Sequence, residues 1–476
     1  MLNEDGRLIP DQQINVRSLA LRHGSWASVG TACSLLFALL STLILARVLS
    51  PADFARFTVV RTGAAFLGTL AAFGLGTTAL THLGRFDSEA NPERKQVYLL
   101  KIAGVAAVTS ATFAIIAFAT TILFGKSLTG TPMTVPVAIT IAIATAGGGI
   151  LAVSSDSIRG VGSLSSASLL GNAMQGSPVL HVVTLSSVIL VWFSRLPTWY
   201  DAVAGYTVAC SLAAVCGCMI LCRLVLKGDK SVRWKADSEV VTVRQILASS
   251  WPLAVLASIT FILGGSDLFM TSRFANPDSA ADYVASRRAI VLLAIPMSVL
   301  NTAVRGMISP LYSANMRQAL QRSLRAGSGL VAIPCLAAGV SAMFYPVVVL
   351  RLILGEGYEG AAPILQVLIP GQIVFVLSGC CGTLLNLTGH QRTTLAVNSM
   401  GAAVFLTLGP WVAARFGAIG LATLMSLMQA ILNLVIWMLA IKLTGINTMF
   451  SFRALSGWRS FIRRPTVSIA NDGSDG

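Results

Sequence analysis

The sequence predicts an all-α polytopic membrane protein of about twelve transmembrane helices, in two six-helix bundles related by a parallel repeat around a central cavity. Three observations lead to this fold class. Only 11% of the 476 residues are charged and the mean hydropathy is +0.76, whereas about a quarter of the residues of a soluble domain are charged. The apolar residues form blocks of about 20 or more, the length that a helix needs to cross a bilayer core. The chain also repeats itself at an offset of 226 residues.

The expected spans follow one another with short polar connections. In chain order they cover Ser25–Leu49, Phe57–Leu83, Tyr98–Phe124, Met133–Val153, Ala167–Phe193, Ala202–Leu226, Ile246–Met270, Tyr283–Ile308, Leu324–Leu350, Ala362–Leu387, Thr393–Phe416 and Ala418–Leu443. The chain therefore divides into an N-terminal segment (1–24), a first bundle (25–226), a linker (227–245), a second bundle (246–444) and a basic tail (445–476).

The distribution of basic residues predicts the orientation. Of the 34 Lys and Arg residues, 23 fall in the N-terminal segment, the even-numbered loops and the tail, and 7 fall in the odd-numbered loops. Because basic residues concentrate on the cytoplasmic side, both termini are expected in the cytoplasm. The net charge of +15 has the same origin. It does not indicate a nucleic-acid partner, because no basic soluble domain carries it.

The sequence gives no sign of an enzyme, a metal site or a cofactor. All eight cysteines lie inside apolar blocks, where cysteine acts as a small packing residue, whereas disulfide and zinc cysteines lie in polar segments with ligand spacing. Paired carboxylates, a nucleophile triad and a phosphate-binding loop are not apparent either.

The internal repeat aligns the start of the second span with the start of the eighth. The segment RVLSPADFARFTVVRT, from Arg47, lies over RFANPDSAADYVASRR, from Arg273, so that Pro51 matches Pro277 and Arg61 matches Arg287. Each half then holds six helices that start from the same side of the membrane. A parallel repeat of this kind is typical of transporters.

Charges inside the spans are rare and are candidates for function. Arg61 and Arg287 are expected one helical turn in from the outer ends of their spans, where two guanidinium forks facing each other would bind a diphosphate. The alternative is that each arginine extends to the outer headgroups and binds lipid phosphate. Arg305 follows Arg287 by 18 residues, about 27 Å along the same helix face. It is a third candidate, although the positive-inside rule also accounts for it. Arg288 is about 100° further round the helix than Arg287 and faces elsewhere.

Asp267 and His181 are the candidates for ion coupling. Asp267 lies near the outer end of its span and either carries a coupling ion or pairs with Arg287 or Arg273. His181 is expected near the middle of its span, where it either relays protons or is a neutral imidazole bonded to a hydroxyl of another helix.

The chain resembles bacterial polysaccharide flippases of the multidrug/oligosaccharidyl-lipid/polysaccharide exporter superfamily. The resemblance rests on SWASVGTACSLLFALLSTLILARVLSPADFARF in the first span and loop, SWPLAVLASITFILGGSDLFM in the seventh span, LILGEGYEGAAPILQVLIPG before the tenth, and LNLTGHQRTTL after it. It implies a V-shaped pair of bundles around a cationic cavity lined by spans 1, 2, 7 and 8. It also implies a multi-pass protein of the bacterial cytoplasmic (inner) membrane.

The resemblance implies transport of undecaprenyl-diphosphate-linked glycan from the inner to the outer leaflet by alternating access, for surface polysaccharide such as O-antigen lipopolysaccharide or exopolysaccharide. The partners it suggests are this glycan, membrane lipids, a polysaccharide polymerase and a chain-length regulator. No span is expected after residue 444, in contrast to the fourteen-helix lipid II flippases. Three other functions stay open: a drug or cation antiporter of the same superfamily, a membrane glycan polymerase or ligase, and a scaffold for envelope assembly.

Overall fold

The computed structural model describes residues 33–88, 92–129, 133–161, 164–171, 177–193, 195–226, 242–313 and 316–450. The predicted N-terminal segment lies outside the described residues, as do most of the predicted linker and the tail beyond residue 450. All the regular structure in the described ranges is helical.

The described chain forms a series of helices joined by short connections. They are Cys33–Val48, α2 (Pro51–Ala71), α3 (Leu75–Ser88), α4 (Pro92–Thr129), α5 (Val135–Gly160), α6 (Leu164–Leu170), α7 (Pro178–Trp192), α8 (Trp199–Leu226), α9 (Val243–Phe274), α10 (Pro277–Ser313), α11 (Arg317–Phe344), α12 (Pro346–Leu354), η1 (Glu359–Ala361), α13 (Ala362–Ser378), α14 (Cys381–Leu387) and α15 (Gln391–Thr444).

These helices account for the twelve predicted spans. Among the described residues, nine helices are long and apolar enough to cross a membrane. One of them, α15, has 54 residues and bends at Gly417, where φ is 64° and ψ is −153°, so it supplies two spans. The shorter apolar helices Cys33–Val48 and Pro178–Trp192 supply the remaining two. The prediction of a twelve-helix membrane bundle is confirmed.

The surface of the bundle is apolar, as a lipid environment requires. Large apolar side chains point outward on several helices. Ile115 on α4 is 69% exposed and Phe344 at the end of α11 is 75% exposed. Exposing apolar side chains to lipid costs no free energy, and the helices satisfy the hydrogen bonds of their own backbone groups.

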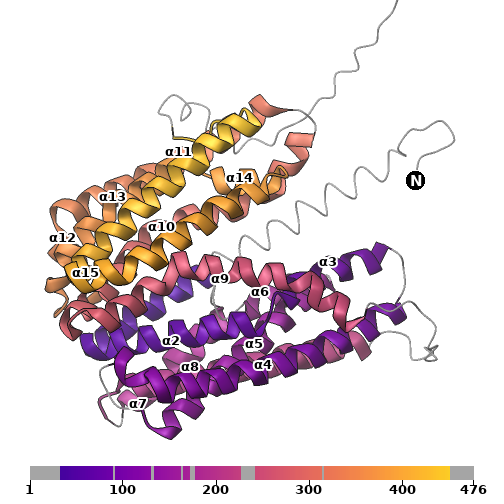
Figure 1. The fold of residues 1–476 in the computed structure, drawn as a ribbon, viewed down its shortest axis with the longest axis horizontal. Helices are drawn as coiled ribbons and strands as arrows, with labels where there is room; N and C mark the ends of the chain where they lie inside the picture. The colour runs from indigo at the N-terminus through magenta and orange to yellow at the C-terminus, as the bar shows by residue number, and fades with distance from the viewer. Residues whose placement is uncertain are drawn as a thin grey trace, which may run out of the picture.

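The helices form two halves, with α9 between them (Figure 1). Helices α2 to α8 lie on one side and α10 to α15 on the other, and α9 packs against α2, α3, α4 and α15. Early in α9, Ile246 is buried in the same apolar cluster as Leu75 and Tyr98 of the first half. The Oγ atoms of Ser250 on α9 and Thr78 on α3 are 2.8 Å apart in a buried hydrogen bond. The seventh predicted span therefore contacts both halves.

A second contact joins the halves at the start of α2. The Tyr358 hydroxyl donates to the backbone oxygen of Ala46 over 2.8 Å, and the Tyr358 ring meets Phe54 edge to face at 6.2 Å. The Arg47 guanidinium donates to the backbone oxygen of Leu352 over 2.7 Å. The three residues of the first half, Ala46, Arg47 and Phe54, lie in or just before the predicted first outer loop, so this contact holds the halves together at the expected outer end.

Four predicted spans are interrupted in the structure. The span predicted over Phe57–Leu83 ends as α2 and resumes as α3 after a turn in which Phe73 (φ 48°) and Gly74 (φ 70°) take left-handed conformations. A Cβ on Gly74 would lie 2.6 Å from the backbone oxygen of Ser250, so this break also lets α9 approach closely. The other interruptions separate α6 from α7, α11 from α12 and α13 from α14.

The repeat is visible in how α2 and α10 begin. They start at Pro51 and Pro277, which the sequence repeat aligned. Proline at the first helical position is favourable because its missing N–H is not needed there. The helices also start earlier than predicted. Arg61 and Arg287 each lie ten residues into their helix, about 15 Å from its start, and not one turn in as expected.

Candidate functional site

Two arginines, one from each half, line the same small polar pocket. Arg61 comes from α2, ten residues after its first proline, and Arg288 comes from α10 of the other half. The pocket measures about 20 Å³, room for about one water molecule. Its lining is Ser41, Thr42, Leu45, Phe54, Phe57, Thr58, Arg61, Leu180, His181, Thr184, Tyr206 and Arg288. We call this the arginine pocket.

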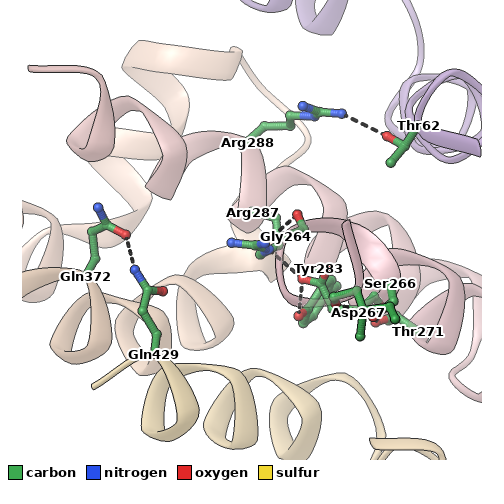
Figure 2. Close-up of polar contacts among 11 residues, drawn as sticks. Thr62, Gly264, Ser266, Asp267, Thr271, Tyr283, Arg287, Arg288, Gln372 and Gln429 are labelled. Carbon is green, nitrogen blue, oxygen red and sulfur yellow. Dashed lines mark hydrogen bonds and ion pairs between the residues drawn. The ribbon is translucent and has the colours of Figure 1, made fainter. Parts of the chain in front are cut away.

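Within the part of the chain that the structure describes, neither arginine of this pocket forms an ion pair with a carboxylate. Among the described residues, no Asp or Glu oxygen lies within 4.0 Å of the Arg61 or Arg288 guanidinium. Arg288 makes a long hydrogen bond of 3.4 Å to the Thr62 hydroxyl of the first half, as Figure 2 shows. It also lies within electrostatic reach of Arg61. Two partly buried cations that repel each other form a site that an anion with several oxygens would stabilise.

Arg287 points away from this pocket and is neutralised by Asp267 (Figure 2). Its Nε lies 2.5 Å from Asp267 Oδ2. The same oxygen accepts a hydrogen bond of 2.8 Å from the Tyr283 hydroxyl, and a terminal nitrogen of Arg287 donates to the Gly264 backbone oxygen over 3.2 Å. Asp267 is fully buried, so this is a buried ion pair within the second half. Of the two interpretations of Asp267, pairing with Arg287 is the one that the structure contains.

The structure therefore departs from the predicted Arg61–Arg287 clamp. Arg61 meets Arg288 in the arginine pocket, whereas Arg287 is bound to Asp267. The reason is the rotation between neighbouring residues of a helix, about 100° each. It turns one arginine of α10 toward α2 and the other toward α9. Sequence reasoning set Arg288 aside. The sequence could have identified Arg288 as a candidate, because it is one of only four basic residues inside the expected spans.

The span predicted over Ala167–Phe193 is interrupted between α6 and α7, so His181, predicted near the middle of that span, lies near the start of a helix and lines the arginine pocket. It belongs to the first turn of α7, which starts at Pro178 and is capped by the Ser177 side chain. The imidazole is 6% exposed, and its Nε2 has no hydrogen-bond partner. Arg61 and Arg288 are both within electrostatic reach of the ring. A buried, unpartnered ring nitrogen beside two cations marks the place that the oxygen of a bound anion or a water would occupy.

Arg305 does not join either arginine cluster. It is exposed and lies on the last turns of α10, about 27 Å from Arg287 along the helix. Within the described residues, no three His, Cys, Asp or Glu side chains come together as a set of metal ligands.

Two helical halves with a cationic pocket where they meet, set within apolar spans, are the architecture of a membrane transport protein. The family model described as "Polysaccharide biosynthesis protein" matches residues 20–316, more than half of the chain. The chain belongs to this family. A second family model, MatE, matches residues 252–411. A search of curated protein sequences gave no match.

Solved structures share the fold. The lipid II flippase MurJ in its inward closed conformation is 14% identical with a TM-score of 0.63, covering 91% of this chain and 89% of that one. An inward-facing multidrug resistance MATE family transporter of the MOP superfamily is 16% identical with a TM-score of 0.60, covering 86% and 94%. A MOP superfamily transporter from Pyrococcus furiosus is 15% identical with a TM-score of 0.57, covering 90% and 95%. The predicted membership of the polysaccharide biosynthesis family is confirmed by the family match, and these solved structures show that the fold is shared.

Proposed function

We propose that this transporter is a flippase for polyprenyl-diphosphate-linked oligosaccharide in surface polysaccharide synthesis. The observation that carries the proposal is the arginine pocket, where Arg61 and Arg288 from opposite halves lie together and no Asp or Glu oxygen of the described residues lies within 4.0 Å of either guanidinium. A diphosphate presents several anionic oxygens, and each guanidinium offers a planar fork of donors that matches them. The polysaccharide biosynthesis family of the chain supports a glycan-linked substrate.

The mechanism would be alternating access of a site shared by the two halves. At the expected outer end the halves are joined through Tyr358 and Arg47. This conformation would receive substrate from the cytoplasmic side. In this conformation the arginine pocket has room for about one water molecule, so a diphosphate would enter when the halves part at Arg61 and Arg288. Its charge would then offset the repulsion between the two guanidinium groups. Arg305, near the opposite end of α10, would make the first contact with the incoming phosphates. The polyprenyl tail would stay in lipid between the halves.

The driving force would act through His181 or Asp267. His181 lies inside the arginine pocket with one unpartnered nitrogen, so a proton taken up there would add to the charge that holds the diphosphate. Asp267 is engaged by Arg287, so a role in coupling would require this pair to open during the cycle. We propose the bacterial inner membrane as the site of action, with both termini cytoplasmic. A polysaccharide polymerase and a chain-length regulator would act on the exported unit.

The experiment is to replace Arg61 and Arg288 singly with Ala in a strain that lacks the chromosomal gene. Each charged hydrogen bond contributes about 1.5–3 kcal/mol, so each variant should lower export about tenfold or more. Lipid-linked oligosaccharide should then accumulate on the cytoplasmic leaflet. Arg415→Ala, an exposed arginine of α15, is the matched control. Wild-type surface polysaccharide in both variants, at normal membrane levels of the protein, would refute the proposal.

An antiporter for drugs or cations is the second candidate. The MatE match over residues 252–411 favours it. Against it stand two observations: none of the described residues lining the arginine pocket is an Asp or Glu, and the buried Asp267 nearby is already paired with Arg287. Sensitivity of a deletion strain to cationic drugs, with its surface glycan intact, would decide for the antiporter.

A further inference from the structure

A second, larger pocket lies between α9 and the helices of the second half. It measures about 500 Å³ and is bounded by α9, α10, α13, α14 and α15, a volume typical of sites for small organic ligands. Its notable feature is a set of six carboxamide side chains, Asn301, Gln372, Asn386, Asn398, Gln429 and Asn433. We call it the amide pocket.

The amide pocket carries almost no net charge. Among the described residues that line it there is no Asp or Glu, and the one charged residue is Arg287, which Asp267 neutralises. Carboxamides both donate and accept hydrogen bonds, so a ring of them suits a neutral ligand with many hydroxyls. A divalent cation would require carboxylates, and an anion would find no free positive charge. Phe375 and Met425 add apolar surface, against which the C–H faces of a sugar ring can pack.

Two buried polar groups of this pocket lack a partner. Gln372 is 4% exposed. Its Oε1 accepts a hydrogen bond of 2.8 Å from the Gln429 amide, as Figure 2 shows, while its own Nε2 has no acceptor. The Thr394 hydroxyl, on a residue 7% exposed, is also unpartnered. An unpaired buried group costs about 1–3 kcal/mol, so these atoms mark places where a ligand would supply the missing bonds.

Helix α10 connects the amide pocket with the arginine pocket. Arg287 lines the first and its neighbour Arg288 lines the second. A lipid-linked oligosaccharide carries its sugar chain directly beside its diphosphate. The diphosphate matches the arginine pocket, and the adjoining sugars match the amide pocket.

We propose that the amide pocket binds neutral sugars of the lipid-linked oligosaccharide while the diphosphate occupies the arginine pocket. This inference rests on the proposed flippase function and adds a sugar subsite in the second half. The glycan recognised there is uncharged where it meets Gln372, Asn398 and their neighbours, because the pocket offers amides and no free cation.

The test is binding to the purified full-length protein in lipid nanodiscs with two separate probes. One is the oligosaccharide released by mild acid from the lipid-linked intermediate of the host strain, and the other is inorganic pyrophosphate. Gln372→Leu keeps the volume of the side chain but loses its hydrogen bonds. It should weaken oligosaccharide binding at least tenfold and leave pyrophosphate binding unchanged. Asn398→Leu, at a half-buried position where folding is less at risk, should act in the same direction.

Two controls separate this inference from the proposed function. Thr407→Val, at an exposed position of α15 outside both pockets, should bind both probes as the wild type does. Arg288→Ala should lose pyrophosphate and retain the free oligosaccharide. If pyrophosphate binds but oligosaccharide binding is absent or unaffected by Gln372→Leu and Asn398→Leu, the sugar subsite is refuted while the flippase proposal stands. If Arg288→Ala leaves pyrophosphate binding intact, the arginine pocket is not the diphosphate site and the proposed function fails.

Discussion

Replacing Asp267 with Asn tests the buried ion pair between α9 and α10. The carboxylate is fully buried and lies 2.5 Å from Arg287. Removing it leaves a guanidinium that is only 14% exposed with the Gly264 carbonyl as its remaining partner. Breaking a buried pair by removing one partner costs about 3–5 kcal/mol. Asn can still accept from Tyr283, so we expect a loss of about 3 kcal/mol in the free energy of unfolding.

The double variant Asp267→Asn with Arg287→Met makes the prediction specific to the pair. Exchanging a buried ion pair for groups without charge is often neutral, so the double variant should be more stable than Asp267→Asn alone. The coupling energy between the two positions should reach about 2 kcal/mol. An exposed pair supplies the control. Glu359→Gln removes the charge that pairs with Arg351; the side chains of Glu359 and Arg351 are 41% and 59% exposed. This change should lower the free energy of unfolding by at most about 1 kcal/mol.

The assay is reversible unfolding in mixed micelles with a rising fraction of SDS, followed by tryptophan fluorescence. The midpoint for Asp267→Asn should move to a clearly lower SDS fraction, and the double variant should recover most of that shift. The reasoning fails if Asp267→Asn unfolds at the same SDS fraction as the wild type. It also fails if the double variant loses as much stability as Asp267→Asn and Arg287→Met lose together.

Three further substitutions test the joints of the fold. Gly74→Ala combines a left-handed backbone (φ 70°) with a Cβ 2.6 Å from the Ser250 carbonyl, whereas Gly417→Ala meets only backbone strain, because the space around it is open. We expect about 1–3 kcal/mol for the strain at Gly417 and a larger loss at Gly74 in the same SDS titration; equal losses would count against the close approach of α9. Tyr358→Phe removes a buried hydrogen bond to the Ala46 carbonyl, worth about 1 kcal/mol, and should shift spin-label distances between α2 and α12 toward longer values. An unchanged distance distribution would mean that this bond does not hold the outer end closed.

The number of spans and their repeat were predictable because both depend on composition and spacing. The number of hydrophobic blocks predicts the number of spans, because it does not depend on how the helices pack. The break before Ala418 was predicted as well, since a glycine separates two apolar blocks there. The interruptions inside other spans were not predicted, because a block of apolar residues gives no sign of a turn within it. Their local signals exist, as at Phe73–Gly74 and at Tyr345–Pro346, where the residue before a proline leaves the helical region. Such residues are common in membrane helices and do not by themselves indicate a break.

The site was predictable in its residue types but not in its pairing. The sequence identified the charged residues within spans and aligned Arg61 with Arg287. Which of two adjacent arginines faces the other half depends on the rotation of α10 about its axis, and that is set by packing against α2 and α9. The amide pocket escaped prediction entirely. Its six carboxamides come from four helices, α10, α13, α14 and α15, spread over more than a hundred residues. Asn and Gln carry no formal charge, so they are not conspicuous in an apolar span.

The neighbouring positions of Arg287 and Arg288 have a thermodynamic consequence. Both residues lie on one rigid helix, so a movement of α10 that changes one pocket also changes the other. A ligand in either pocket therefore influences the geometry of both. Linkage is reciprocal: if sugar in the amide pocket raises the affinity for diphosphate, diphosphate raises the affinity for sugar by the same factor. A complete substrate would then bind more tightly than the affinities of its separate parts suggest. A lipid diphosphate without sugars would lack this coupling through α10 and would bind more weakly.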